Sequence, residues 1–386
     1  MTTTINNEHK KLNVPNLRFP EFQGEWKEHK LEDITAEIGD GIHATPIYDD
    51  NGTFYFVNGN NISEYGITIT ATTQKVTEEE ALRNNASALN SYSILLSING
   101  TVGNVALYKN ESIMLGKSAC YINVSSNINR NYIFYYLMMP KCQFYFTSEL
   151  TGTTIKNLSL KSIRKTKVLL PNANEQSKIA RLFDAINERI ATQNKIIEDL
   201  KKLKSAISHI LFSSKGAIHL SEIANVVMGQ SPSSNAYNDQ GLGMPLVQGN
   251  LDISNGKTTP RLYTAEFNQT TEKGNIILTV RAPVGEVAKA TQKVCLGRGV
   301  CAIIPHEENM SDFIYQYLTF YKFMWRRYEQ GSTFTSINGS DVRNIFCPKV
   351  RNVSILTLLD IKINIEERVV KQYQSQKQYM LYQMFI

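Results

Sequence analysis

The chain repeats itself, and this repeat constrains the fold more than any other feature of the sequence. Segments of the first half recur in the second half in the same order, at offsets that drift from about 190 to 173 residues. Residues 25–212 and 217–386 are therefore expected to be two similar halves. The matched pairs are KLEDITAEI (30–38) with HLSEIANVV (219–227), YFVNGNNIS (55–63) with PLVQGNLDIS (245–254), SILLSINGTVGNVAL (93–107) with NIILTVRAPVGEVAK (275–289), LGKSACYI (115–122) with LGRGVCAI (296–303), NYIFYYLMM (131–139) with DFIYQYLTF (312–320), and TGTTIKNLSLKSIR (151–164) with QGSTFTSINGSDVR (330–343).

Each half ends in a long helical pattern. Residues 175–212 contain no Pro or Gly, and their apolar side chains recur at alternating steps of four and three, as in a coiled coil. At about 1.5 Å per residue this helix would be roughly 57 Å long, so it favours a partner helix over a place in one compact core. The expected seam positions in this helix are Ile179, Phe183, Ile186, Ile190, Ile197, Leu200 and Ile207.

A second copy of this helix follows at an offset of 173, where Phe212 aligns with Phe385. The polar interruptions of the seam also align, Gln193 with Glu366 and Lys204 with Lys377, which suits two helices that must pair in one register. The fold class expected is α+β: two similar mixed modules, each followed by a long helix, with the two helices paired as an antiparallel coiled coil. The seam positions expected in the second helix are Leu359, Ile363 and Val370.

Within a module, short apolar runs separated by Asn and Gly predict strands. One amphipathic helix is expected at 131–146, with its copy at 312–328, and a last strand is expected at 166–171, with its copy at 344–348. Asn172 or Asn174 can cap the first long helix. The strand-like runs are FYFV, SILLSI, NVALY and ACYINV.

Composition excludes several classes of protein. With 42% hydrophobic and 20% charged residues the chain resembles an ordinary globular protein, and no apolar run approaches the roughly 20 residues of a membrane span. The polar N-terminus lacks a signal-peptide core, so a cytoplasmic location is expected. The five cysteines form no CxxC pair, so neither disulfides nor a zinc site is indicated. The net charge of +6 is compatible with nucleic-acid binding.

Two similar but unequal modules on antiparallel helices suit recognition of two DNA half-sites separated by a fixed distance. Half-sites one turn of B-DNA apart lie about 34 Å apart, which a helix of this length can span. Because the modules differ in sequence, the two half-sites should differ as well. A tandem protein–protein interaction scaffold without sequence-specific DNA binding would have the same outline.

The ordered set of motifs resembles the specificity (S) subunit of type I restriction–modification enzymes. The resemblance covers the chain from about residue 14 and is carried by VPNLRFPEFQGEWKEHKLEDI (14–34), the two VxGN segments, the GTVG and APVG turns, the TGTT and GSTF loops, and the two Pro–helix sequences. It implies two target recognition domains, residues 25–171 and 215–348, with an N-terminal segment at 1–24 and spacer helices at 172–214 and 349–386.

The same resemblance implies the partners and the chemistry. Each recognition domain would read one half of a bipartite, asymmetric site in double-stranded DNA. The helices would set the spacer and dock two modification subunits, which bind S-adenosylmethionine and methylate adenine. Two restriction subunits that use ATP and Mg²⁺ would complete the assembly, and this chain would hold no cofactor and no catalytic site. The second helix departs from the pattern, with Asn364, Glu366 and Gln376 near its seam.

The candidate DNA-contacting residues lie on polar loops that follow strand-like runs, because base edges are read by Arg, Lys, Asn, Gln, Ser and Thr side chains. Asn99 over Arg281 and Lys117 over Arg298 are substitutions that would change base preference. The predicted set is His43, Thr45, Asn60, Asn99, Thr101, Lys117, Thr153, Thr154 and Lys156 in the first half, and Ser231, Ser233, Asn250, Arg281, Arg298, Ser332, Thr333 and Thr335 in the second.

Motifs for chemistry are missing from the sequence. GKS at 116–118 lacks the earlier Gly of a phosphate-binding loop, because residue 111 is Glu. The six histidines show no metal-binding spacing. A catalytic role for this chain alone is therefore not expected, although an enzyme acting on nucleotides through an unrecognised site remains an alternative.

Overall fold

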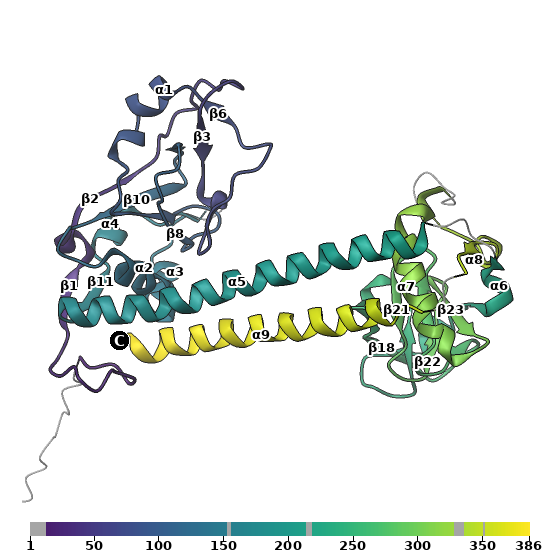
Figure 1. Ribbon diagram of the computed structural model, residues 1–386. Helices are drawn as coiled ribbons and strands as arrows, with labels where there is room; N and C mark the ends of the chain where they lie inside the picture. Colours follow the sequence, from purple (N-terminus) through teal and green to yellow (C-terminus); the bar gives the residue numbers. More distant parts are fainter. Residues whose placement is uncertain (1–12, 153–155, 214–217, 328–335, 350–351) are drawn as a thin grey trace, which may run out of the picture. The chain divides into compact units, whose positions relative to one another are not determined.

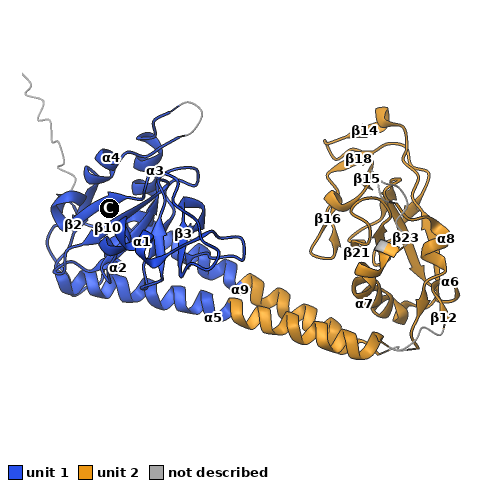
Figure 2. Cartoon of the chain, turned by 90° about the horizontal axis from the view of Figure 1, so that it is seen from above, with its two compact units in different colours: residues 1–193, 369–386 blue, residues 194–368 orange. Residues whose placement is uncertain are grey.

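The computed structural model describes residues 13–152, 156–213, 218–327, 336–349 and 352–386. The chain forms two compact units, one of residues 1–193 with 369–386 and one of residues 194–368 (Figure 2). Each unit therefore combines one module with part of each long helix.

The first unit is built on a four-stranded antiparallel sheet in the order β2-β10-β7-β8. Ile122 of β10 lies between Ile38 of β2 and Ile94 of β7, and every residue of β7 and β10 is buried. Burial on both faces explains why these two strands are mostly apolar in the sequence and do not alternate with exposed polar residues. The strands are β2 (Thr35–Asp40), β10 (Ala119–Val124), β7 (Ser93–Ser97) and β8 (Val105–Leu107).

Smaller sheets complete this module. In one of them β3 pairs parallel with β9 and antiparallel with β6. β4 and β5 form a short hairpin, and the pairing of β1 with β11 brings together segments far apart in the sequence. These strands are β1 (Lys27–Lys30), β3 (Phe54–Val57), β4 (Ile62–Ser63), β5 (Gly66–Ile67), β6 (Lys75–Val76), β9 (Ile113–Leu115) and β11 (Lys167–Leu170).

The expected single helix at 131–146 is wrong: the structure has two helices, α2 (Arg130–Met138) and α3 (Pro140–Ser148). Met139 between them is extended (φ −63°, ψ 147°), and Pro140 is the first residue of α3. Proline lacks the N–H that a continuous helix needs and disfavours helical geometry in the residue before it. The module also contains α1 (Glu78–Arg83) and α4 (Leu160–Arg164), and α2 lies between the four-stranded sheet and α5 (Ala173–Phe212) (Figure 1).

The second unit repeats this architecture, which confirms the internal repeat. Its central strands run in the matching order β13-β23-β20-β21, and β15 pairs parallel with β22 as β3 does with β9. The strands are β12 (Ile218–His219), β13 (Ala224–Met228), β14 (Tyr237–Asn238), β15 (Met244–Val247), β16 (Ile253–Ser254), β17 (Lys257–Thr258), β18 (Leu262–Thr264), β19 (Thr270–Thr271), β20 (Ile276–Thr279), β21 (Val287–Lys289), β22 (Val294–Leu296), β23 (Val300–Pro305) and β24 (Phe346–Cys347).

The helices of the second unit differ from the expectation at one place. The helix expected at 312–328 is α7 (Ser311–Tyr321), and a 3-10 helix (Lys322–Arg327) continues from it. The tighter turns bury Trp325, which is 1% exposed. The other helices are α6 (Leu220–Ile223), α8 (Gly339–Arg343) and α9 (Ser354–Met384).

The first long helix, α5, begins at a side-chain cap. Asn172 accepts a hydrogen bond from the backbone N–H of Glu175 (3.0 Å), so Asn172 rather than Asn174 is the cap. The second long helix, α9, ends in the aromatic core of the first unit. Phe385, which follows α9, lies 5.3 Å from Tyr132, 5.7 Å from Tyr136 and 5.7 Å from Phe183 between ring centroids.

The second unit holds the matching arrangement, with Phe212 at the end of α5. Its ring lies 6.2 Å from Phe313, 5.4 Å from Tyr317 and 5.4 Å from Phe320, all on α7. Phe212 and Phe385 are the two residues that align in the repeat. The end of each long helix thus supplies one phenylalanine to an equivalent aromatic cluster.

Most predicted seam residues are buried. Leu200, Ile207 and Leu359 are half-buried, and the others are buried: Ile179, Phe183, Ile186, Ile190, Ile197, Ile363 and Val370. Contacts join the two helices inside each unit, with Arg189 hydrogen-bonded to Tyr373 in the first and Lys201 paired with Glu367 in the second. A continuous coiled coil along both helices stays a prediction.

The two seam lysines each have an acidic partner. Lys204 pairs with Asp360 of α9 (2.5 Å), whereas Lys377 pairs with Glu64 at the tip of the β4–β5 hairpin. Lys377 is 2% exposed, so Glu64 supplies the partner that a buried ammonium group needs. The two lysines align in the repeat but use different kinds of partner.

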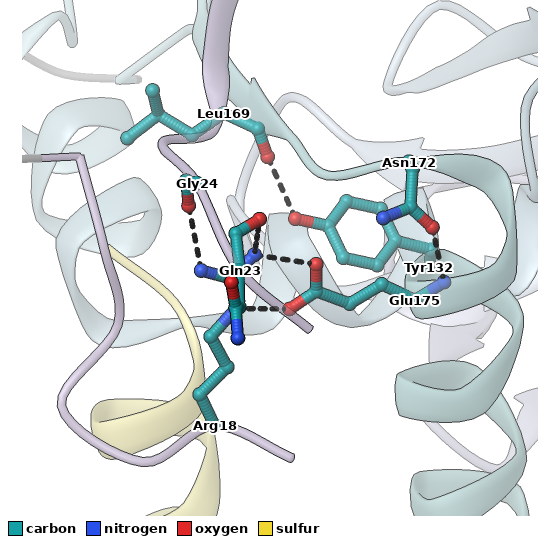
Figure 3. Close-up of polar contacts among 7 residues, drawn as sticks. All are labelled: Arg18, Gln23, Gly24, Tyr132, Leu169, Asn172 and Glu175. Carbon is teal, nitrogen blue, oxygen red and sulfur yellow. Dashed lines mark hydrogen bonds and ion pairs between the residues drawn. The ribbon is translucent and has the colours of Figure 1, made fainter. Parts of the chain in front are cut away.

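The N-terminal segment is fastened to the first turn of α5 by a two-bond ion pair (Figure 3). Arg18 donates from Nε and Nη2 to the two carboxylate oxygens of Glu175, at 2.7 and 2.8 Å. Its Nη1 donates to the backbone oxygen of Gly24 (2.6 Å). The Glu175 side chain is 1% exposed, so the pair satisfies a buried carboxylate.

The five cysteines are all buried and free. Burial raises the pKa of Cys301 and Cys347 to about 12, so these thiols are not reactive near neutral pH. In the ranges that the structure describes, no helix combines the length and the apolar character needed to cross a bilayer.

Replacing Phe385 by Ala should destabilise the first unit by about 3–5 kcal/mol, because a large aromatic side chain leaves a packed cluster. Amide hydrogen exchange should show faster opening of α2 with α7 unchanged, and Phe212→Ala should give the reverse. Phe144→Ala is the control, because that ring is 76% exposed. Equal effects of Phe385→Ala on α2 and α7 would contradict separate clusters.

Replacing Arg18 by Ala should cost about 3 kcal/mol in the free energy of unfolding, because Glu175 would be left buried without its partner. Denaturant unfolding followed at the first unit measures this loss. Lys178→Ala is the matched control, since it removes the exposed pair of Lys178 with Glu21 between the same two segments and should change little. Equal losses in the two variants would refute the role of burial.

Candidate nucleic-acid interface

In the first module, four loops that follow strand ends meet at one place. The loop after β2 joins the turn after β9, because the backbone N–H of Ile42 donates to Leu115 (2.9 Å). The loop after β3 joins the same turn, since the N–H of Gly59 donates to the Ser118 hydroxyl (2.8 Å). Thr101, on the turn after β7, donates to the backbone oxygen of Gly59 (3.0 Å). The predicted DNA-contacting loops are therefore neighbours.

The predicted residues of the first module lie on these loops. Asn99 is half-buried and forms a backbone bridge with Asn157, which places Lys156 beside this turn. His43 is exposed and hydrogen-bonded to Asp40 (2.8 Å). Thr153 and Thr154 lie outside the described residues. The remaining predicted residues are exposed: Thr45, Asn60, Thr101, Lys117 and Lys156.

In the second module, four predicted residues from four separate segments line one pocket of about 360 Å³. The four are Ser231, Asn250, Arg281 and Arg298. Ser233 is exposed on the same loop as Ser231. Ser332, Thr333 and Thr335 lie outside the described residues.

Backbone and side-chain contacts hold these segments together. The Ser231 hydroxyl accepts a hydrogen bond from the backbone N–H of Arg298 (3.0 Å), and Gly229 bonds to Val300 (3.0 Å). Arg281 forms a backbone bridge with Ser336, just as Asn99 does with Asn157. The two modules therefore build the same arrangement at the same strand ends.

A glycine shared by both modules shapes the turn that carries Asn99 or Arg281. Gly103 has φ 93° and Gly285 has φ 91°, a backbone conformation that favours glycine. A Cβ atom at either position would also collide with a neighbouring side chain, Gln143 or Trp325. The GTVG and APVG motifs thus fix a turn, which the variable residue, Asn99 or Arg281, directly precedes.

Sequence reasoning missed Asp252 and Arg261, which line the same pocket. Asp252 is 3% exposed and accepts a hydrogen bond from Arg261 Nε (3.0 Å). The aligned segments offered one signal: Asn61 in NGNNIS is replaced by an acidic residue in QGNLDIS. Arg261 lies outside every aligned motif, so only the fold brings it to the pocket.

The pocket gathers side-chain donors of the kind that bind nucleic acids. Three arginines meet there, and the guanidinium group donates in a fork that matches a base edge or a phosphate. Among the residues that the structure describes, no three His, Cys, Asp or Glu side chains gather as a metal site. The first module has Lys117 and Asn99 where the second has Arg298 and Arg281, so the two surfaces offer different donors.

The sequence matches the family described as type I restriction modification DNA specificity domain over residues 23–202 and again over 216–372. A Methanocaldococcus jannaschii protein assigned as the type I restriction enzyme MjaX specificity subunit is 26% identical over 368 residues, which cover 88% of this chain and 86% of that protein.

Solved structures share the fold. The crystal structure of a type I restriction–modification system S subunit from M. genitalium superposes with a TM-score of 0.61 at 20% identity, covering 97% of this chain and 99% of that one. A chain from the structure of an assembled type I R-M system superposes with a TM-score of 0.58 at 20% identity, covering 93% and 97%. With the family matched over both halves, the chain belongs to the type I restriction–modification specificity subunits.

Proposed function

We propose that this chain recognises DNA for a type I restriction–modification complex, each module reading one half of a bipartite, asymmetric target. One observation carries the proposal: equivalent strand-end loops gather in both modules, yet they present different polar side chains. A shared scaffold with Asn99 and Lys117 on one side and Arg281 and Arg298 on the other can read two different sequences.

The long helices have the proposed task of pairing as an antiparallel coiled coil and setting the spacer between the half-sites. The Arg189–Tyr373 contact in the first unit and the Lys201–Glu367 pair in the second support this pairing. The two contacts fit antiparallel helices, because the residue further along α5 contacts the residue less far along α9.

The complex would contain two modification subunits docked on the helices and two restriction subunits. The modification subunits would supply S-adenosylmethionine and methylate adenine, and the restriction subunits would supply ATP hydrolysis with Mg²⁺. This chain would contribute recognition without chemistry or a cofactor of its own, and it would act on cytoplasmic DNA. Support comes from the similar chain solved as part of a type I R-M system.

The direct test is to express the chain with its modification subunit and to locate methylated adenines across the host genome. One bipartite motif with two different halves is the expected result. As a control, the modification subunit should methylate DNA when it is combined with another specificity subunit. If that control succeeds and this chain still gives no methylated motif, the proposal is overturned and an interaction scaffold is favoured.

Exchange of residues 25–170 for those of a related specificity subunit should change one half of the methylated motif. The other half and the spacer should stay the same, because the second module and both helices are untouched. Sequencing of methylated adenines measures both halves in one experiment. A change in both halves, or in neither, would show that the modules do not read DNA independently.

A further inference from the structure

Asp252 is a buried carboxylate at the edge of the pocket in the second module. It ends the 3-10 turn Asn250–Asp252, and its side chain is 4% exposed. One carboxylate oxygen, Oδ2, accepts the backbone N–H of Gln248 (2.9 Å), and Oδ1 accepts Arg261 Nε (3.0 Å). Within the described parts of the chain, Arg261 is its one ion-pair partner.

Arg261 keeps most of its donors free. Its side chain is 57% exposed, and its two terminal nitrogens make no hydrogen bond to any residue that the structure describes. Arg281 and Arg298 line the same pocket. Asp252 therefore holds the guanidinium group through Nε, while more than half of the Arg261 side chain stays accessible to solvent.

The first module shows that the turn folds without this pair. Asn61 stands where Asp252 does, and its Oδ1 accepts the backbone N–H of Asn58 (3.0 Å), as Asp252 accepts that of Gln248. The next backbone bond is also repeated, from Thr68 to Asn61 and from Thr259 to Asp252, both at 2.8 Å. Two residues later the first module has Thr70 and the second has Arg261. An amide oxygen is thus enough to hold the turn, and what the carboxylate adds is the ion pair with Arg261.

We propose that Asp252 is a positioning residue that holds Arg261 for a two-bond contact with a guanine in the half-site read by the second module. The inference rests on the proposed function and deepens it. Guanine offers O6 and N7 as paired acceptors in the major groove, and they match the free Nη1 and Nη2 donors. An arginine already held in place loses less side-chain freedom on binding.

The ion pair favours a base over a phosphate as the ligand. A phosphate contact gains chiefly from net positive charge and counterion release. Asp252 offsets the charge of Arg261 but leaves its donor geometry intact. An exposed lysine would serve a phosphate without a buried carboxylate beneath it.

The test uses the complex with the modification subunit and four forms of the chain: wild type, Arg261→Lys, Asp252→Asn and Glu272→Gln. Arg261→Lys keeps the charge and removes the fork, and Asp252→Asn installs the residue type of the first module. Glu272→Gln is the matched control, because it also removes one negative charge and one ion pair, with exposed Lys293, in the same unit. Thermal unfolding checks that all four complexes are folded.

The wild-type motif is expected to contain a guanine in its second half. Arg261→Lys should reduce the preference for that guanine about 10- to 100-fold. Asp252→Asn should reduce the preference for the same guanine by a smaller factor, about 3- to 10-fold, because Arg261 remains but is no longer held in place. The first half-site and the Glu272→Gln motif should not change.

Three results would overturn the inference while the proposed function stands. The motif could stay unchanged in both pocket variants, which would leave Arg261 as only the counterion of Asp252. The relaxed position could be a base other than guanine. Binding could weaken equally for all sequences in Arg261→Lys, with no base position relaxed, which would indicate a contact that carries no sequence information. A wild-type complex with no motif would instead refute the proposed function, and this inference with it.

Discussion

The structure depends on one repeated packing interaction, the insertion of a phenylalanine from the end of each long helix into the aromatic cluster of a module. Phe385 packs on α2 in the first unit, and Phe212 packs on α7 in the second. The start of α5 belongs to the first core through Ile179 and Phe183, and its end belongs to the second. Each long helix thus contributes residues to two hydrophobic cores. The stability of each module therefore depends on the helix residues that complete its core.

The two modules share the order of their central strands and differ in the polar side chains at the strand ends. The same turns recur with Gly103 and Gly285 in the same conformation, and the same strand ends bring the loops together. At the turn that both modules share, the second module has the buried Asp252 beside Arg261 where the first has Asn61. This arrangement allows the polar surface to change while the sheet that carries it stays the same.

Much of this fold could be predicted from the sequence, because the repeat gives two copies of every signal. The buried strands β7 and β10 and the helix α5 are strongly patterned. The sequence analysis missed β2, because it is an edge strand in which only Ile38 is buried. The prediction of one helix over 131–146 was wrong, because Pro140 ends the first helix and begins a second. The loops at the candidate site were predicted correctly as neighbours of strands. Their convergence and the Asp252–Arg261 pair depend on three-dimensional contacts that no motif records.

The proposed spacer function assigns to α5 and α9 the distance between the half-sites that the two modules would read. Inserting one heptad into the middle of both helices tests it most directly, because seven residues lengthen a helix by about 10 Å, or roughly three base pairs. The methylated motif should keep both half-site sequences and gain about three base pairs of spacer, whereas insertion into one helix alone should abolish methylation. An unchanged spacer, or altered half-sites, would contradict the account.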